Sequence, residues 1–304
     1  MDIRYRQARV DDAAAAASVF ADAVNDLNQT RGFGDRPITP APHPFFAFSV
    51  NEQPEGCWVA EHHGEVVGFT ISWVCGSFWF LAFLFVSPRH HGKGIGRELL
   101  AKALTNHGQT TVTNRGLITF AYNPTAISLY MRHAMYPREP VYWMIGSAHA
   151  IRAALPRTES LEYEPEQIDA DHGDLSSLDR VDASVLGYPR EAHHRYLLGA
   201  PGSSCHLFRK HGAPHAYAYV WSNGRVGPLS ATTPSVFEGI LKRSLALSAA
   251  GDAEEVFIVA PGSNERAMAL ALTLGMRVAH PSLLMSSKPF GTWTCYLFHS
   301  PGLM

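Results

Sequence analysis

The expected fold of the N-terminal half is decided by one stretch of sequence, Phe83-Leu-Phe-Val-Ser-Pro-Arg-His-His-Gly-Lys-Gly-Ile-Gly-Arg-Glu-Leu-Leu100. It begins inside the apolar and aromatic run Phe78–Val86, which is too short to cross a membrane and typical of a buried strand. Three alternating glycines follow, and leucines then recur at helical spacing. Because glycine lets the backbone approach an anion and a helix N-terminus has unpaired N–H groups, strand, glycine turn and helix together predict a diphosphate site.

Two other phosphate-binding motifs are excluded by the residues present. A nucleotide P-loop needs GxxxxGK followed by Ser or Thr, which the sequence lacks. A dinucleotide fingerprint, GxGxxG, would need glycine at Arg97 or at Leu99, and an acidic residue about 20 positions later. Residues 116–120 are Gly-Leu-Ile-Thr-Phe and contain no acid. A tight turn without a ligand is the remaining alternative, but three glycines in five residues are costly for a mere connection.

A second motif follows the next apolar strand. It has the form Asn-x-x-Ala-x-x-Leu-Tyr and consists of Asn123, Ala126, Leu129 and Tyr130. With the glycine turn, it resembles the GCN5-related N-acetyltransferases (GNAT), whose acetyl-CoA motif is (Arg or Gln)-x-x-Gly-x-(Gly or Ala). Gly94 and Gly96 match that pattern, whereas His91 stands at the Arg or Gln position. The resemblance covers about residues 3–146.

The resemblance implies a sheet that is splayed at its fourth strand, with the pantetheine arm of acetyl-CoA lying in the gap. By analogy, the backbone of Leu84 and Val86 pairs with the arm and Asn123 contacts it. The pyrophosphate is expected on the turn formed by His91, Gly92, Lys93, Gly94, Ile95, Gly96 and Arg97. Tyr130 is expected to protonate the departing thiolate, since a phenol with a pKa near 10 suits a thiol near 8.5. The alternative for Tyr130 is an aromatic residue of the core with its hydroxyl bonded locally.

The acceptor implied by the resemblance is an amine, and its general base is open. Related enzymes often use a glutamate on or near the strand Phe78–Val86, which here contains no acid. The candidates, each with a solvated surface role as the alternative, are Asp22, Asp26, Asp35, His90 and His133. An amine with a depressed pKa would need no base. Aromatic residues of the strand that line an acceptor pocket would favour an apolar or aromatic amine; protein acetylation and a non-catalytic acyl-CoA sensor are the other possibilities.

The second half repeats the order of elements of the first. One constant offset relates Asn123, Ala126, Leu129, Ala134 and Met135 to Asn264, Ala267, Leu270, Gly275 and Met276. We therefore expect an α/β (α+β) chain of two tandem GNAT-like domains, each a mixed, mostly antiparallel, twisted sheet flanked by helices. The expected ranges are 1–147 for the catalytic domain, 148–160 for a linker and 161–304 for a degenerate copy.

The copy is expected to wall the acceptor site and stabilise the first domain. It has Ala271 where Tyr130 stands, and Arg225-Val-Gly-Pro-Leu-Ser-Ala-Thr-Thr233 in place of the glycine turn. Pro228 has no backbone N–H to donate, so the same phosphate-binding turn cannot form. An independent ligand site in this domain is the less favoured alternative.

Near the N-terminus, Asp11 is expected to open a helix through about Ala23. The stretch from Asn25 to Pro44 is rich in Asn, Gly, Pro and Asp, as in a long loop with room for one short helix. Two strands, Cys57–Glu61 and Val66–Val74, are expected to form a hairpin.

Composition favours a folded protein, with 46% hydrophobic and 17% charged residues. A net charge of -2 argues against nucleic-acid binding. The acidic N-terminal residues argue against a signal peptide. We expect a cytoplasmic protein, either a monomer or a homodimer, without a membrane partner. The four cysteines form no CxxC pair and are expected to be buried and reduced. No metal site is expected, and the pairs His193-His194 and His211…His215 are interpreted as surface histidines.

Overall fold

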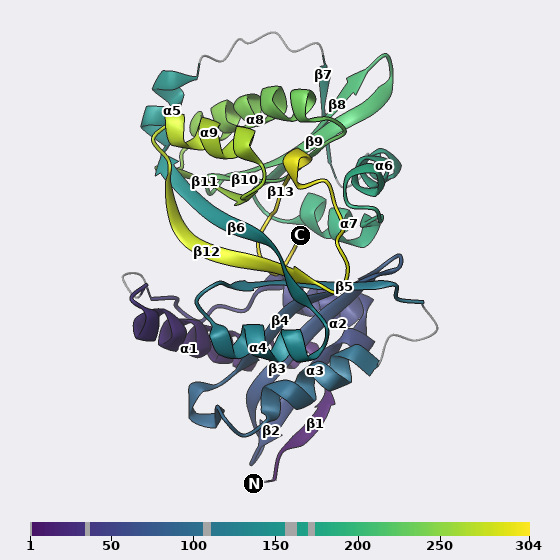
Figure 1. Ribbon diagram of the computed structural model, residues 1–304, viewed down its shortest axis with the longest axis vertical. Coiled ribbons are helices and arrows are strands. Elements are labelled where there is room, and N and C mark those ends of the chain that lie inside the picture. The colour runs from purple at the N-terminus through teal and green to yellow at the C-terminus, as the bar shows by residue number, and fades with distance from the viewer. Residues whose placement is uncertain (1, 34–36, 106–110, 156–162, 170–173) are drawn as a thin grey trace. The chain divides into compact units, whose positions relative to one another are not determined.

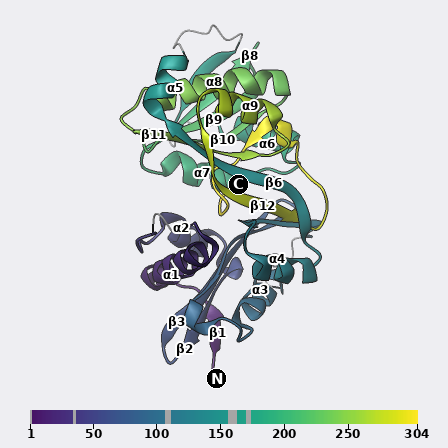
Figure 2. The ribbon, with the colours of Figure 1, turned by 60° about the vertical axis from the view of Figure 1, so that its left-hand side comes forward.

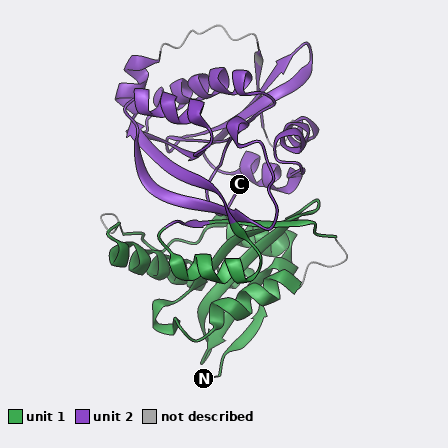
Figure 3. Cartoon of the chain, viewed as in Figure 1, with its two compact units in different colours: residues 1–118, 122–136 green, residues 119–121, 137–304 purple. Residues whose placement is uncertain are grey.

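The computed structural model describes residues 2–33, 37–105, 111–155, 163–169 and 174–304. They form two compact units (Figure 3). Unit 1 comprises residues 1–118 and 122–136, and unit 2 comprises residues 119–121 and 137–304.

The strands of unit 1 are hydrogen-bonded in the order β1-β2-β3-β4-β5. Its elements are β1 (Arg4–Gln7), α1 (Ala13–Arg31), α2 (Pro44–Glu52), β2 (Cys57–His62), β3 (Glu65–Cys75), β4 (Phe78–Val86), α3 (Ile95–Thr105), β5 (Asn114–Phe120) and α4 (Pro124–Arg132). The first four strands pair antiparallel and β4 pairs with β5 in parallel. Helices α1 and α2 cover one face of the sheet, and α3 and α4 lie side by side on the other (Figures 1 and 2). The expected bounds of β4 and the expected hairpin of β2 and β3 are confirmed.

Helix α1 is longer than its composition suggests. It continues past Ala23 to Arg31 and ends at Gly32, whose φ of 79° is left-handed. Asn25, a residue that favours loops, is accommodated because its side chain leaves the helix and makes two hydrogen bonds with the backbone of Ile38, at 2.9 and 2.7 Å. The expected loop from residue 25 onward is therefore wrong over this stretch, because a tertiary contact replaces the local bonds that usually end a helix.

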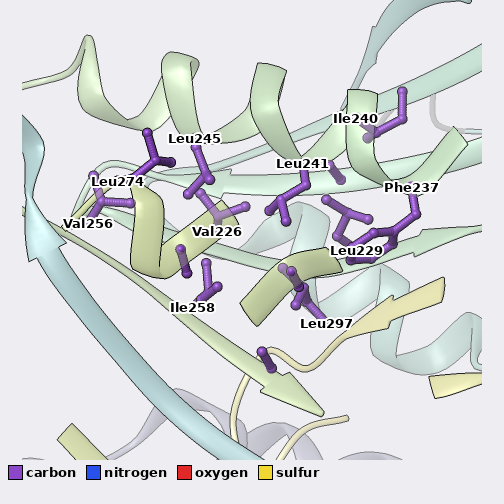
Figure 4. Close-up of a cluster of buried hydrophobic side chains, with 14 of the residues drawn as sticks. Val226, Leu229, Phe237, Ile240, Leu241, Leu245, Val256, Ile258, Leu274 and Leu297 are labelled. Carbon is purple, nitrogen blue, oxygen red and sulfur yellow. The ribbon is translucent and has the colours of Figure 1, made fainter. Parts of the chain in front are cut away.

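The strands of unit 2 are hydrogen-bonded in the order β12-β6-β11-β10-β9-β8-β7. Its elements are β6 (Tyr136–Ser147), α5 (Ala148–Ala154), β7 (Glu164–Ile168), α6 (Leu175–Val185), α7 (Glu191–Gly199), β8 (Ser203–Lys210), β9 (Ala213–Trp221), β10 (Arg225–Ala231), α8 (Pro234–Ala249), β11 (Glu255–Pro261), α9 (Glu265–Thr273), β12 (Arg277–Ser286) and β13 (Tyr296–Leu297). Strand β13 pairs with β10. Phe237 and Leu241 of α8 pack with Leu229 and Ile258 in the core of this unit (Figure 4).

Helix α5 stands where residues 148–160 were expected to form a linker. Ala148 and Ile151 belong to the hydrophobic core of unit 2, and Arg152 donates from Nε to the carbonyl oxygen of Ala249 at 2.7 Å. Residues 156–160 lie outside the described part of the chain. The helix packs on unit 2 because its apolar face is buried there. The Pro and Ser residues around it, which suggested a linker, do not prevent this.

The two units carry a physical repeat. Elements β5, α4 and β6 begin at residues 114, 124 and 136, and β11, α9 and β12 begin at 255, 265 and 277, so one offset serves all three. The side chains of Asn123 and Asn264 each cap the following helix by accepting from the backbone N–H three residues on, both at 3.1 Å. Ala134 and Gly275, past the ends of the two helices, are both left-handed, with φ of 59° and 75°. The matched residues are thus the start and stop signals of one helix used twice.

Candidate functional site

The sheet of unit 1 opens between β4 and β5. Parallel pairing joins Phe78 to Asn114 and continues to Leu81 with Leu117, and in the described strands it does not reach the last residues of β4. On its other side β4 stays paired with β3 as far as Val86. The second half of β4 therefore presents one edge without a neighbouring strand.

A bulge at Ala82 marks the point where the strands part. Ile71 of β3 is opposite Phe83 and Ser72 is opposite Leu81, so Ala82 is the extra residue of β4. A bulge bends its strand and increases the local twist, which directs the rest of β4 away from β5.

The backbone of Leu84 and Val86 faces the open edge. The N–H of Ser87 donates to the carbonyl oxygen of Val67 in β3 at 2.8 Å. Hydrogen-bonded pairs alternate along an antiparallel ladder, so Phe85 and Phe83 also direct their N–H and C=O groups toward β3. Leu84 and Val86 lie between these pairs and direct theirs away from β3. These are the two residues for which the family resemblance implies backbone pairing with the pantetheine arm.

The glycine turn lies between β4 and the N-terminus of α3. Gly92 and Gly94 are left-handed, with φ of 76° and 81°. A Cβ at Gly92 would meet nothing within 4 Å, and one at Gly94 would meet only the Arg97 Nη2 atom at 3.7 Å, so the space above the turn is free of protein among the described residues. Ile95, at the start of α3, is buried with Leu99 against β2 and β3, which fixes the helix N-terminus beside the turn.

Charged and polar side chains close the turn onto itself. Nε2 of His91 lies 2.8 Å from the carbonyl oxygen of Val86, and Nζ of Lys93 donates to the carbonyl oxygen of Arg89 at 3.2 Å. His91, Lys93 and Arg97 are exposed, while Gly96 is half-buried under Val86, where a Cβ would lie 3.7 Å from Cγ2. An anion above the turn would meet the first N–H groups of α3 and the cationic side chains of Lys93 and Arg97.

Asn123 has a structural duty. Its Oδ1 accepts the backbone N–H of Ala126 and so caps α4, while its amide N–H₂ group takes no part in the cap. The cap explains why asparagine precedes a proline at the first helical position, a feature that a binding role alone would not require.

Tyr130 is the residue that α4 buries. It is 5% exposed, whereas the next residue, Met131, is 41% exposed. Burial raises the pKa of the Tyr130 phenol well above its usual value near 10. None of the described residues hydrogen-bonds to its hydroxyl, so the local bond expected of a purely structural core tyrosine is missing. The phenolic O–H of Tyr130 therefore donates to no other group in the described part of the chain.

The candidate bases are scattered. Asp22 and Asp26 are exposed on α1, and Asp35 lies outside the described residues. Burial and the nearby Lys93 lower the pKa of His90, whose ring centroid is 5.4 Å from that of His62. Partial burial and Arg115 lower the pKa of His133, so its ring is neutral at pH 7 and able to accept a proton.

Aromatic side chains gather on the α1 face at the splayed end of β4. The ring of Phe20 in α1 packs edge-on against Phe85 at 4.9 Å and against Phe83 at 6.2 Å between centroids. All three rings are only partly buried. Phe33 stacks on Tyr122 at 4.3 Å, and the Tyr122 hydroxyl donates to Oδ1 of Asn28 at 2.8 Å, which ties the end of α1 to the end of β5.

The expectation that His193 and His194 are surface residues is wrong, because both are buried in unit 2. Nε2 of His194 lies 2.8 Å from Oδ2 of Asp182, and Nδ1 lies 2.9 Å from the Tyr219 hydroxyl. Asp182 itself occupies the apolar stripe of α6 between buried valines. A carboxylate on such a stripe is the sequence signal that could have predicted a buried partner. The four cysteines are free and buried, as expected.

The described residues contain no group of three or more His, Cys, Asp or Glu side chains arranged to hold a metal ion. Among the helices in the described ranges, none is both long and apolar enough to span a membrane.

Comparison with known proteins identifies the fold. Residues 21–135 match the model of the acetyltransferase (GNAT) family. Over 70 residues the chain is 37% identical to an uncharacterized N-acetyltransferase of Archaeoglobus fulgidus; the match spans 20% of this chain and 46%, or about half, of that relative.

Solved structures match over nearly the whole chain. A putative acetyltransferase of Pyrococcus horikoshii is 20% identical with a TM-score of 0.72, covering 99% of this chain and 96% of the other. A tandem GNAT protein from the clavulanic acid biosynthesis pathway is 13% identical with a TM-score of 0.55, covering 95% and 99%. The predicted fold class, two tandem GNAT-like halves of mixed sheet and helices, is confirmed.

Proposed function

Because residues 21–135 match the model of the acetyltransferase (GNAT) family, we propose that unit 1 is an N-acetyltransferase that moves the acetyl group of acetyl-CoA to a primary amine. Acetyl-CoA would supply the acetyl group as an activated thioester. The acceptor is proposed to be a small molecule.

The observation that carries this proposal is the open edge of β4 next to the glycine turn. Leu84 and Val86 direct backbone groups to that edge, and an extended pantetheine arm has amides that pair with them as a strand would. Gly92 and Gly94 leave free space at the N-terminus of α3, where a pyrophosphate fits the helix dipole and the N–H groups. One ligand with an amide arm and a diphosphate satisfies both features. Asn123 contributes through its free amide N–H₂ group.

Tyr130 is the proposed general acid. As the amine nitrogen bonds to the acetyl carbon, the carbon–sulfur bond breaks and the thiolate takes the phenolic proton of Tyr130. The raised pKa keeps Tyr130 protonated at neutral pH, as an acid needs to be before the reaction. The amine loses one proton in the same reaction, to water or to a base, and His133, next to α4, is neutral and available for it.

The acceptor is proposed to carry an apolar or aromatic group near its amine. Phe20, Phe83 and Phe85 present partly exposed rings beside the open end of β4, and β4 contains no carboxylate that would bind a polycation. Burial of such a group against these rings contributes roughly 25 cal/mol per Å². If polyamines or aminoglycosides prove the best acceptors, this assignment is wrong.

The experiment is thiol release from acetyl-CoA across a panel of amines and amine-bearing peptides. Turnover of a small aromatic amine that falls in Tyr130→Phe supports the proposal, with Tyr136→Phe as the matched control because Tyr136 is 46% exposed. Turnover of peptides alone would indicate a protein acetyltransferase.

A non-catalytic acyl-CoA sensor is the second candidate. The strand Phe78–Val86, which often carries the base in related enzymes, has no acidic residue. Tight binding of acetyl-CoA without turnover on any amine would favour the sensor.

A further inference from the structure

Strand β10 of unit 2 is the counterpart of strand β4 of unit 1. In unit 1 the parallel pairing of β4 with β5 ends at Leu81 opposite Leu117. In unit 2 the parallel pairing of β10 with β11 ends at Val226 opposite Ile258. Leu117 and Ile258 are related by the same offset as helices α4 and α9, so Val226 corresponds to Leu81.

The correspondence continues along both strands. Each bulges directly after this point. Ser87 after β4 and Thr232 after β10 each donate their N–H to the preceding strand at 2.8 Å. The two residues are equivalent, because Ser87 follows Leu81 by the same number of positions as Thr232 follows Val226. Leu229 therefore corresponds to Leu84, and like Leu84 it directs its backbone groups away from the antiparallel neighbour.

The gap of unit 2 is filled by the chain itself. Strand β13 pairs antiparallel with β10, Leu297 opposite Leu229 and Tyr296 opposite Ser230. On the other side the N–H of Phe298 donates to the carbonyl oxygen of Val259 in β11 at 2.9 Å. The segment thus lies between β10 and β11, beginning where the direct pairing of these two strands stops.

A buried ionic cluster holds this segment. The ring centroid of Tyr296 lies 5.7 Å from the guanidinium carbon of Arg190. Nε of Arg190 donates to Oδ2 of Asp182 at 2.8 Å, and His194 contacts the same oxygen at 2.8 Å. All four side chains are almost fully buried. Tyr296 is therefore packed against Arg190 at the N-cap of α7, which is itself bound to Asp182 of α6, and not only against the strands.

The N-terminus of α8 also differs from that of α3. The helix begins with Pro234, which has no N–H, and Oγ1 of Thr233 accepts the N–H of Val236 at 3.4 Å. The turn before it contains no glycine. The groups that would hold a diphosphate in unit 1 are missing or capped here.

We infer that β13 and its flanking residues, Thr294–His299, are a built-in occupant of the gap of unit 2. This segment takes along β10 the place that a pantetheine arm takes along β4, so each chain binds one acyl-CoA, in unit 1. The identity of the ligand rests on the proposed function. The filling of the gap by β13 does not, and the two are tested separately.

The first test is calorimetric titration of the full chain with coenzyme A, followed by hydrogen exchange read by mass spectrometry. One molecule is expected per chain, with slower exchange in peptides covering residues 83–97 and no change in residues 225–233 or 294–299. Gly94→Glu, which places a carboxylate in the turn, is expected to abolish the binding. A second bound molecule in the native chain, or protection of residues 225–233 by coenzyme A, overturns the inference.

The second test needs no ligand. The backbone amides of Leu297 and Phe298 are expected to exchange on the order of 100-fold more slowly than those of the His63–Gly64 turn, because they are paired inside a sheet. Exchange as fast as in that turn overturns the inference. If the native chain binds no coenzyme A, the proposed function fails, and this measurement still decides whether β13 fills the gap.

Discussion

Nε2 of His91 lies 2.8 Å from the carbonyl oxygen of Val86, so the side chain at the Arg or Gln position of the family pattern ties the glycine turn to the end of β4. A carbonyl only accepts, so Nε2 carries the hydrogen in this contact. The departure from the family pattern therefore has a local function in this chain.

His91→Ala is expected to raise KM for acetyl-CoA about fivefold with little change in kcat, because one hydrogen bond of about 1 kcal/mol that orders the turn is lost. His91→Gln keeps a donor and should recover most of the loss. Steady-state kinetics at varied acetyl-CoA measures both. Equal KM values for the native chain and His91→Ala would show that the turn is ordered without this bond.

Gly92→Ala tests the cradle against a matched control. Gly92 and Gly64 are both left-handed, with φ of 76° and 85°, and a Cβ at either would meet no atom within 4 Å. Alanine at each should therefore cost a similar strain of about 1 kcal/mol in the free energy of unfolding. Only Gly92→Ala is expected to weaken coenzyme A binding, by about tenfold, since Gly64 lies in the hairpin of β2 and β3. Calorimetric titration and denaturant unfolding separate the two effects, and equal affinity in both variants would remove Gly92 from the site.

Tyr130→Phe is expected to lower kcat by about 10² to 10³ without raising KM for acetyl-CoA, as general acids contribute on that scale. Burial raises the pKa of the phenol, so Tyr130 stays protonated well above neutral pH and the native enzyme should show no alkaline loss of kcat from this group below about pH 10. A pH–rate profile measures this. If Tyr130→Phe keeps its kcat, the phenol is a packing residue.

The sequence predicted the parts of unit 1 that depend on local chemistry. The strand Phe78–Val86 and the glycine turn follow from an apolar run and from the glycines themselves. The cap that Asn123 provides for α4 was not predicted. Which side chains of β4 point to which face of the sheet was harder to predict. The bulge at Ala82 shifts the alternation of side chains between the two faces, and this bulge arises from the pairing of β4 with β3.

What the sequence could not predict depends on partners that are distant along the chain. Helix α1 continues through Asn25 because the Asn25 side chain hydrogen-bonds to the backbone of Ile38. His194 is buried because its ring contacts the carboxylate of Asp182, which is buried as well. Strand β13 lies between β10 and β11, and this position follows from an opening that neither of those strands encodes alone. In each case a tertiary contact outweighs local propensity.

Asp182→Asn tests whether the ionic cluster of unit 2 stabilises the fold. Burial opposes the ionised form of Asp182, but Arg190 and the bonds from His194 and Tyr217 outweigh it and lower its pKa from 3.8 to about 2. A carboxyl whose pKa is lower in the folded state adds stability above pH 3.8, and that stability is lost as the pH falls toward 2. At pH 7, Asp182→Asn should destabilise the chain by about 3 to 5 kcal/mol, because the Arg190 charge stays buried without its partner. Urea unfolding of the native chain should show a steep loss between pH 4 and pH 2 that is absent in Asp182→Asn and present in Asp252→Asn, an exposed control. The same acid dependence in all three proteins would mean that the cluster does not determine the stability of unit 2.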